Sequence, residues 1–248
     1  MMKITLAQIE IDDNDFTKNA EKIVHIIETH THSNIILFPE LAVTGFPTAD
    51  NLEDKFTQSQ DAFERICQAT LTTQSHILIG QIEQGGTAFY NSAFLIHQGK
   101  HQVLHRKAHL WLDDIGLFTQ GNRSSLVHIL NANVGAQICF DLEFPEGSRA
   151  LAQQGADLIL MPNSNMHPYE NTHFILSQAR AIENQVFVAT CNRVGSGHGG
   201  QFAGESLVVS PFGEVLLQMN EEESIQTLQL DMEQVQLSRK DYQYINHQ

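Results

Sequence analysis

The chain has 248 residues, with 29 acidic residues against 14 Lys and Arg and a net charge of −15. A surface this acidic repels the phosphates of nucleic acids and of anionic membranes, so we expect neither as a partner. Hydrophobic residues make up 42% of the chain, an ordinary share for a globular protein, which argues against disorder.

Short apolar runs bounded by Gly, Pro, Asn or Asp predict strands, and apolar residues at helical spacing predict helices. In chain order, the strands are predicted at residues 3–9, 34–38, 76–81, 91–96, 103–104, 126–130, 134–139, 157–162, 186–192, 205–210, 215–219 and 225–230. Helices are predicted around 16–27, from 56 to 66, over 144–154 and 171–184, and from Met232 to Tyr242.

Two of the predicted strands end alike. Residues 35–40 and 158–163 are both apolar runs that stop at Pro and a polar residue, and both lie between helical segments. This similarity indicates two halves related by an internal two-fold. Many strands with helices between them favour an α/β (α+β) fold of two packed sheets with a helical layer on each side. No Ser-, Gly- or Pro-rich linker divides the chain, so we predict one domain over residues 1–248.

The first ten residues are not typical of a signal peptide, because Glu10 follows only a short apolar run. No run approaches the roughly 20 apolar residues of a membrane span. Cys67, Cys139 and Cys191 are widely spaced, which argues against a disulfide framework and a cysteine zinc site. We therefore expect a protein of the reducing cytoplasm.

Three polar residues lie where apolar strands are predicted to end, which is where mixed folds place their sites. They are Glu40, Lys107 and Cys139. A carboxylate can take the proton of a thiol, and an ammonium can lower the thiol pKa and stabilise an oxyanion. Each residue alone is better interpreted as a cap, a solvated charge or a small buried side chain. Together they form a complete set for acyl transfer without a cofactor or metal.

At these residues the sequence resembles the nitrilase superfamily of carbon–nitrogen hydrolases, in its simple amidase branches. Three motifs carry the resemblance, in family order: residues 38–46 (FPELAVTGF), 105–111 (HRKAHLW) and 135–146 (GAQICFDLEFPE). The resemblance implies a four-layer αββα sandwich that forms a homodimer or a higher homo-oligomer. It implies Cys139 as nucleophile, Glu40 as general base, and Lys107 with the backbone N–H of Phe140 as oxyanion stabilisers.

The loop after the lysine departs from the family pattern. Relatives carry a second glutamate there, whereas residues 112–121 contain no Glu. Asp114 is the nearest substitute and Asp113 the second choice. Because Asp is one methylene shorter, we expect the loop to lie closer to the lysine or to reach it through water.

Other patterns have simpler interpretations. His97, His101, His105 and His109 recur every four residues, but Gly99 breaks the run and the flanks predict a hairpin, so we expect partly exposed strand histidines rather than a metal site. The Gly-rich segment 195–200 predicts a flexible loop near the site. The remaining charges at Glu146, Arg149, Arg180 and Glu183 predict a structural ion-pair network.

The sequence therefore predicts a cysteine-dependent amidase that acts on a small linear amide, with Phe46, Glu143 and Asn165 contacting the substrate. Many similar members carry Arg where Glu143 stands, so a Glu favours a cationic substrate such as an ω-amino amide. The competing interpretation is that Glu143 points away from the pocket and pairs with Arg149 or another surface cation. An N-carbamoyl-amine hydrolase, an ω-amidase, a metal-dependent hydrolase and an inactive binding module remain alternatives. Residues 40–51 also resemble the glutaminase domain of glutamine-dependent NAD synthetases, which would require a separate partner.

Overall fold

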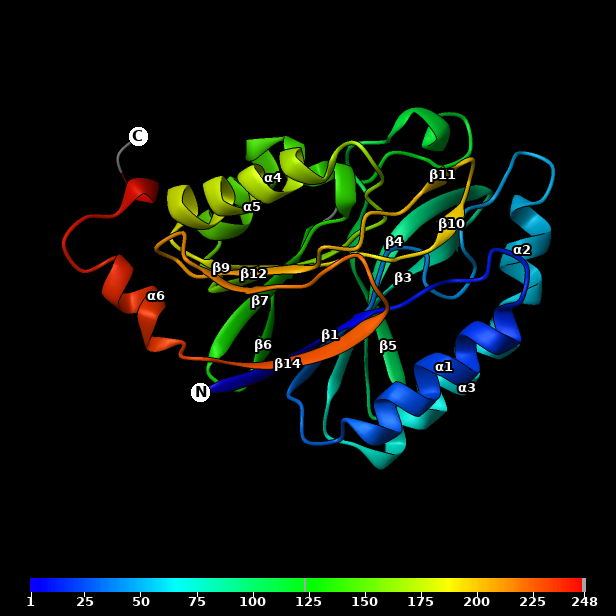
Figure 1. The fold of residues 1–248 in the computed structure, drawn as a ribbon, viewed down its shortest axis with the longest axis horizontal. Helices are drawn as coiled ribbons and strands as arrows, with labels where there is room; N and C mark the ends of the chain where they lie inside the picture. The colour runs from blue at the N-terminus through cyan, green and yellow to red at the C-terminus, as the bar shows by residue number, and fades with distance from the viewer. Residues whose placement is uncertain (123, 247–248) are drawn as a thin grey trace.

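A computed structural model describes residues 1–122 and 124–246. Residues 123, 247 and 248 belong to the predicted 1–248 domain and lie outside the described residues. Two six-stranded sheets pack face to face, and helices cover the outer face of each (Figure 1). The α/β sandwich with layers α, β, β and α is the predicted fold.

The first sheet has the order β14-β1-β2-β3-β4-β5. Its strands are β1 (Met2–Gln8), β2 (Ile35–Leu37), β3 (His76–Gly85), β4 (Ala88–His97), β5 (Lys100–Arg106) and β14 (Ser224–Leu230). Strands β1, β2 and β3 are parallel, and the other pairings are antiparallel. The parallel strands are connected through α1 (Phe16–Thr29) and through the pair α2 (Leu52–Gln58) and α3 (Gln60–Ala69).

The second sheet has the order β13-β12-β9-β8-β7-β6. Its strands are β6 (Val127–Ile129), β7 (Ala132–Ala136), β8 (Leu158–Pro162), β9 (Phe187–Cys191), β12 (Leu207–Val209) and β13 (Val215–Gln218). Here β7, β8 and β9 are parallel, connected by α4 (Pro145–Gln153) and α5 (Glu170–Asn184). A small hairpin of β10 (Ser196–Gly197) and β11 (Gly200–Gln201) follows β9, and α6 (Glu233–Ser238) follows β14.

The two sheets repeat one another, as the similar strand ends predicted. Each has three central parallel strands joined by crossover helices and flanked by antiparallel strands. In this repeat β2 corresponds to β8, so the turn at Glu40 corresponds to the position of Asn163. The two turns meet, because the backbone N–H of Glu40 donates to the carbonyl of Asn163 at 3.2 Å.

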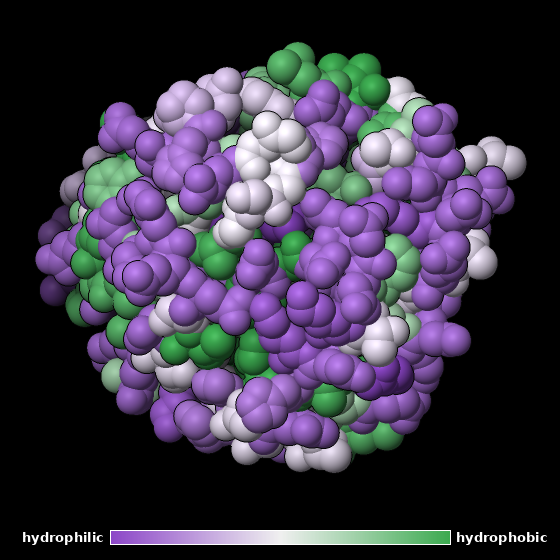
Figure 2. Space-filling model, turned by 45° about the vertical axis from the view of Figure 1, so that its right-hand side comes forward, coloured by the Kyte–Doolittle hydropathy of each residue, from purple (hydrophilic) through white to green (hydrophobic). Residues whose placement is uncertain are grey.

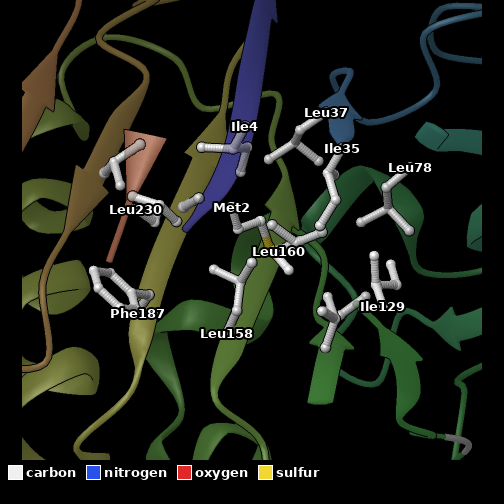
Figure 3. Close-up of a cluster of buried hydrophobic side chains, with 14 of the residues drawn as sticks. Met2, Ile4, Ile35, Leu37, Leu78, Ile129, Leu158, Leu160, Phe187 and Leu230 are labelled. Atoms are coloured by element: carbon white, nitrogen blue, oxygen red, sulfur yellow. The ribbon is translucent and has the colours of Figure 1, made fainter. Parts of the chain in front are cut away.

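The main core lies between the sheets. Alternate residues of the strands point inward from both sides, among them Ile4, Ile35, Leu158 and Leu160, which face one another in Figure 3. Burying such side chains is the chief stabilising contribution to a sandwich of this kind. The core therefore fixes how the first sheet is positioned against the second.

Each outer face is covered by the apolar side of its helices. Ala20, Ile23 and Ile27 of α1 pack on the first sheet, and the carboxylate of Asp15 caps this helix by accepting from the N–H of Lys18 at 2.9 Å. Leu151 of α4 packs on the second sheet. On the face seen in Figure 2, hydrophilic residues predominate and hydrophobic ones form separate patches. In the described part of the chain, no helix is long and apolar enough to cross a membrane.

Several predicted boundaries were wrong. The single helix expected from 56 to 66 is two helices, because the hydroxyl of Ser59 at their junction bonds the carbonyl of Phe56 and competes with the helical pattern. The last helix stops at Ser238, whose carbonyl accepts from the side chain of Gln185. The strand expected at 134–139 stops at Ala136, and the hairpin within 195–201 was not predicted.

Candidate active site

The three strand-end residues meet at one edge of the sandwich. Glu40 lies in the turn after β2 and Lys107 directly after β5, so both come from the first sheet. Cys139 begins a 3-10 turn, Cys139–Glu143, shortly after β7 of the second sheet. The packing of the two sheets thus brings together side chains that are 67 and 32 residues apart in sequence, from 107 − 40 and 139 − 107.

Lys107 is held between two carboxylates. Its ammonium donates to Oε1 of Glu40 at 2.7 Å and to Oδ2 of Asp114 at 2.6 Å, and all three side chains are buried. Asn91 on β4 donates to the same Oε1 at 2.7 Å. The other oxygen of Glu40, Oε2, is buried and has no hydrogen-bond partner among the described residues. This arrangement leaves one carboxylate oxygen available to accept a proton.

Burial and the surrounding charges make the thiol of Cys139 a weaker acid than usual. Burial raises the pKa of Cys139 well above its usual value and the carboxylate of Glu40 raises it further, while Lys107 and a backbone N–H from Ser164 act in the opposite direction. Burial lowers the pKa of Lys107, but the carboxylates of Glu40 and Asp114 outweigh it and raise that pKa overall. The site therefore combines a permanent ammonium with a thiol that needs a base.

Cys139 lies at a strained turn that a buried aspartate stabilises. Its φ is +44°, in the left-handed region that residues with a side chain seldom adopt. Asp141 accepts from the N–H of Ile138 at 3.0 Å and, on the lysine side, from His105 Nε2 at 2.7 Å and His109 N at 2.8 Å. Burial raises the pKa of Asp141, but the hydrogen bonds from His105 and His109 outweigh it and hold the pKa well below its usual range. One carboxylate thus ties the cysteine turn to the lysine segment.

Two glycines let neighbouring backbone approach these segments. A Cβ on Gly80 of β3 would lie 2.4 Å from the backbone nitrogen of Leu41 and 2.5 Å from the Cα of Glu40. A Cβ on Gly121 would lie 2.2 Å from the carbonyl oxygen of Arg106, next to the lysine. Real Cβ contacts are never that short, so a side chain at either position would displace a residue of the site.

A pocket of about 590 Å³, partly open to solvent, leads to Cys139. Phe46, Glu143 and Asn165, the three residues expected to contact a substrate, all line it. Aromatic side chains form much of the wall: the Trp111 ring lies 4.9 Å from that of Phe140 and 5.5 Å from that of Tyr169. The pocket is thus apolar on one wall and carries carboxylates on others.

The carboxylate of Glu143 faces this pocket rather than a surface arginine. It pairs with His173, with 3.7 Å between Oε1 of Glu143 and Nε2 of the histidine. Arg149 instead pairs with Glu183, at 3.9 Å. Among the described residues Glu143 therefore does not pair with Arg149, as one form of the competing interpretation required.

The two aspartates after the lysine have different surroundings. Asp114 is buried and also accepts from the N–H of Trp111 at 3.0 Å, so its short side chain reaches the lysine directly, without water. Asp113 is 62% exposed and pairs with His198 at 3.1 Å across the pocket mouth, where His198 stacks on Phe46. The geometry thus favours Asp114 as the partner of the lysine.

The remaining sequence patterns have structural roles. His105 is buried on Asp141, so the expectation of a partly exposed histidine was wrong there, because this aspartate satisfies its ring. Arg180 pairs with Glu183 and donates to the carbonyls of Leu142 and Glu143, as expected of an ion-pair network, whereas Glu146 is exposed. Among residues 1–122 and 124–246, no cluster of three His, Cys, Asp or Glu side chains could hold a metal ion.

Sequence reasoning missed several residues of the site. Asn91 lies inside an apolar strand pattern, and His173 inside a helix, so neither had a local signal. Asp141 lies in the motif at residues 135–146, and its position two residues after Cys139 could have identified it as a residue of the site. His198 lies in the segment predicted as a loop near the site, and the hairpin turn of that segment brings it to the pocket mouth.

Comparison with known proteins agrees with this geometry. The carbon–nitrogen hydrolase family model matches residues 3–240. An (R)-stereoselective amidase of Pseudomonas sp. is 35% identical over 98% of this chain and 90% of its own length, and a 2-oxoglutaramate amidase of Bacillus subtilis is 29% identical over 93% and 91%. A solved structure of a variant of the Nesterenkonia AN1 amidase from the nitrilase superfamily superposes with a TM-score of 0.86, at 25% identity over 96% and 94% of the two chains. The chain therefore belongs to the carbon–nitrogen hydrolase family of the nitrilase superfamily, whose members act on carbon–nitrogen bonds other than peptide bonds.

Proposed function

We propose that this protein is an amidase that hydrolyses a small linear amide to a carboxylic acid and ammonia through a thioester on Cys139. One observation carries the proposal: Glu40 has one oxygen bound to Lys107 and the other without a hydrogen-bond partner among the described residues, and it lines the same pocket as the half-buried thiol of Cys139. A base, a cation and a nucleophile in contact are the requirement for acyl transfer.

In the first half of the reaction, Oε2 of Glu40 takes the thiol proton as the sulfur of Cys139 attacks the carbonyl carbon. Because the thiol pKa is raised, transfer of the proton accompanies attack rather than preceding it. The tetrahedral intermediate then collapses, Glu40 returns the proton to the nitrogen, and ammonia leaves a thioester behind.

The oxyanion of the intermediate is stabilised by Lys107 and by the backbone N–H of Phe140. A lysine ammonium has three protons, and Glu40 and Asp114 accept two of them, so the third is available to the substrate oxygen. Asp114 acts by fixing the direction of the ammonium. In the second half, Glu40 takes a proton from water, the hydroxide attacks the thioester, and Cys139 leaves with the proton.

The substrate class that fits the pocket best is a cationic amide, such as an ω-amino amide. Glu143 and Asp113 give the pocket negative charge, and Trp111 and Tyr169 offer ring faces that attract an ammonium group. The net charge of −15 attracts cations from a distance. The Bacillus subtilis relative is named for an acidic amide, so the two classes of amide can be compared directly.

An ammonia-release assay tests this proposal with 5-aminopentanamide, 2-oxoglutaramate, a neutral amide of similar length and a carbamoyl amine. We expect the highest kcat/KM for the ω-amino amide and a smaller preference in Glu143→Gln. Glu146→Gln is the matched control, since Glu146 is exposed on the same segment. A preference of the unmodified enzyme for 2-oxoglutaramate would refute the cationic substrate, and inactivity on the whole panel would refute the amidase.

We also infer that residues 1–248 act as one domain that forms a homodimer. Helix α5 exposes Ile175 and Ile182, seven residues apart on one side, and Phe212 is exposed as well. Apolar groups that gather on one face favour association with a second copy. Light scattering after gel filtration measures the mass, and a Glu at Ile182 should weaken a dimer built on this face.

A further inference from the structure

A second, smaller cavity lies behind the wall of the reaction pocket. It has a volume of about 300 Å³, is partly open to solvent, and shares Asn165 and His173 with that pocket. Asn163 and Ser177 line its buried end, and Glu170 and Glu205 line it as well. The cavity therefore adjoins the site of the reaction without containing Cys139 or Lys107.

Two buried acceptors in this cavity lack partners. Asn163 is 2% exposed and Ser177 1% exposed, yet Oδ1 of Asn163 and Oγ of Ser177 have no hydrogen-bond partner within the described residues. An unsatisfied polar group in the interior costs free energy, and native proteins nearly always satisfy it with water or an ion. The cavity is thus built for an occupant that interacts with oxygen atoms.

The charge of the cavity indicates which occupant. Glu205 and Glu170, which lies 3.3 Å from His167, bring two carboxylates, and no Lys or Arg is among the described residues that line the cavity. Burial raises the pKa of Glu205 and the charges of Glu170 and Glu221 raise it further, while His167 acts in the opposite direction, so the repulsion between carboxylates outweighs the nearby histidine. A cation at this place would relieve the repulsion and also satisfy the two orphaned oxygens.

We propose that this cavity binds one monovalent cation of the size of ammonium, coordinated by oxygens of Asn163, Ser177 and Glu205. Oxygen cages of neutral and acidic groups bind cations of this size by replacing their hydration shell. Two sources supply such a cation: potassium from the medium and the ammonium released by the reaction. The second source rests on the proposed function, in which ammonia is produced on the other side of Asn165 and His173.

Binding is tested first without any substrate, so that its outcome does not depend on the amidase proposal. Crystals are soaked in rubidium chloride, whose ion resembles potassium and ammonium in radius and scatters anomalously. We expect an anomalous peak between Asn163, Ser177 and Glu205. Thermal unfolding at constant ionic strength should give a higher Tm in ammonium or potassium chloride than in lithium or choline chloride.

Three variants identify the site. Ser177→Ala and Glu205→Gln should each weaken the apparent affinity for the cation by about tenfold, the effect of losing one charge-assisted contact. Ser177→Ala should still fold, because the hydroxyl it removes has no partner to lose. Glu214→Gln removes an exposed charge outside the cavity and should leave the affinity unchanged.

A cavity that holds only water would give no anomalous peak and equal Tm values in all four salts, and either that result or a peak elsewhere overturns the proposal. If ammonium binds more tightly than potassium, the product is the occupant; equal affinities assign the site to the cation of the medium. A protein that binds rubidium but releases no ammonia from any amide keeps the cation site and loses the proposed function, so the two failures are distinguishable.

Discussion

Replacing Asp114 isolates the contribution of the carboxylate that holds the lysine. Asp114→Ala removes a charge-assisted bond of 2.6 Å to Lys107 and leaves the N–H of Trp111 without its 3.0 Å acceptor. Breaking a buried ion pair by removing one partner costs about 3–5 kcal/mol, and Lys107 keeps Glu40, so we expect the lower end for unfolding. A displacement of the ammonium by about 1 Å should lower kcat about 100-fold, with a smaller change in KM.

The same substitution separates position from charge. The carboxylate of Asp114 contributes to raising the pKa of Cys139, so Asp114→Asn should make the thiol more acidic and allow alkylation by iodoacetamide at lower pH. If kcat nevertheless falls, the orientation of Lys107 is what the reaction requires. Urea unfolding and single-turnover ammonia release provide the two measurements.

Asp113→Asn is the control for unfolding and for kcat with a neutral amide. The exposed pair with His198 contributes about 0–1 kcal/mol, and a neutral substrate does not depend on the charge of the pocket. Full activity in Asp114→Ala, or a larger loss in Asp113→Asn than in Asp114→Ala, would refute the reasoning.

Three further predictions concern the nucleophile, a glycine and a histidine. Cys139→Ala should abolish ammonia release with unchanged circular dichroism. Cys67→Ala should keep most activity, because burial and then the charge of Glu64 raise the pKa of Cys67 to about 12. Equal activity of the two variants would contradict this prediction. Gly80→Ala should lower the free energy of unfolding by about 1–3 kcal/mol and should also lower kcat, because the new methyl group would displace the turn after β2. Urea unfolding and steady-state kinetics measure the two effects, and an unchanged variant would contradict the prediction. The hydrogen bond to Asp141 raises the pKa of His109, so the folded state holds this proton more tightly than the unfolded chain. That stabilisation is complete below the ordinary histidine pKa and is lost as pH rises through the raised value. Over this pH range the free energy of unfolding of the unmodified protein should therefore fall more steeply with pH than that of the His109→Gln variant.

Much of the fold could be predicted because its signals are local. The apolar runs of the strands and the helical spacing of Ala20, Ile23 and Ile27 depend on residues next to one another in sequence. Of the boundaries that were wrong, the split at Ser59 depends on one local hydrogen bond, and two others depend on a distant contact or on one backbone angle. The last helix ends where Gln185, more than 50 residues away, binds its carbonyl, and β7 ends before the left-handed φ of Cys139.

The candidate site divides in the same way. Glu40, Lys107 and Cys139 were found because each lies where an apolar strand is predicted to end, and their motifs resemble those of a known family. Asn91 and His173 could not be found, because a polar residue in an apolar strand or on a helix has many uses, and only the packing of the sheets brings these side chains to the pocket. The choice of Asp114 over Asp113 depended on the 3-10 turn at Leu112–Asp114, which directs Asp114 toward Lys107 and Asp113 toward the pocket mouth.

The division of the site between two sheets has a mechanical consequence. Glu40 and Lys107 belong to the first sheet, whereas Cys139 belongs to the second. Side-chain packing connects the facing layers at the core, and a few hydrogen bonds, such as those from Glu40 to Asn163 and from His105 to Asp141, join them at the site. A small slide of one layer over the other would separate the base from the sulfur while every strand keeps its hydrogen bonds. Heat or mild denaturant should therefore abolish the activity of this protein before circular dichroism detects any loss of strands. Turnover would then report how well the two layers are aligned.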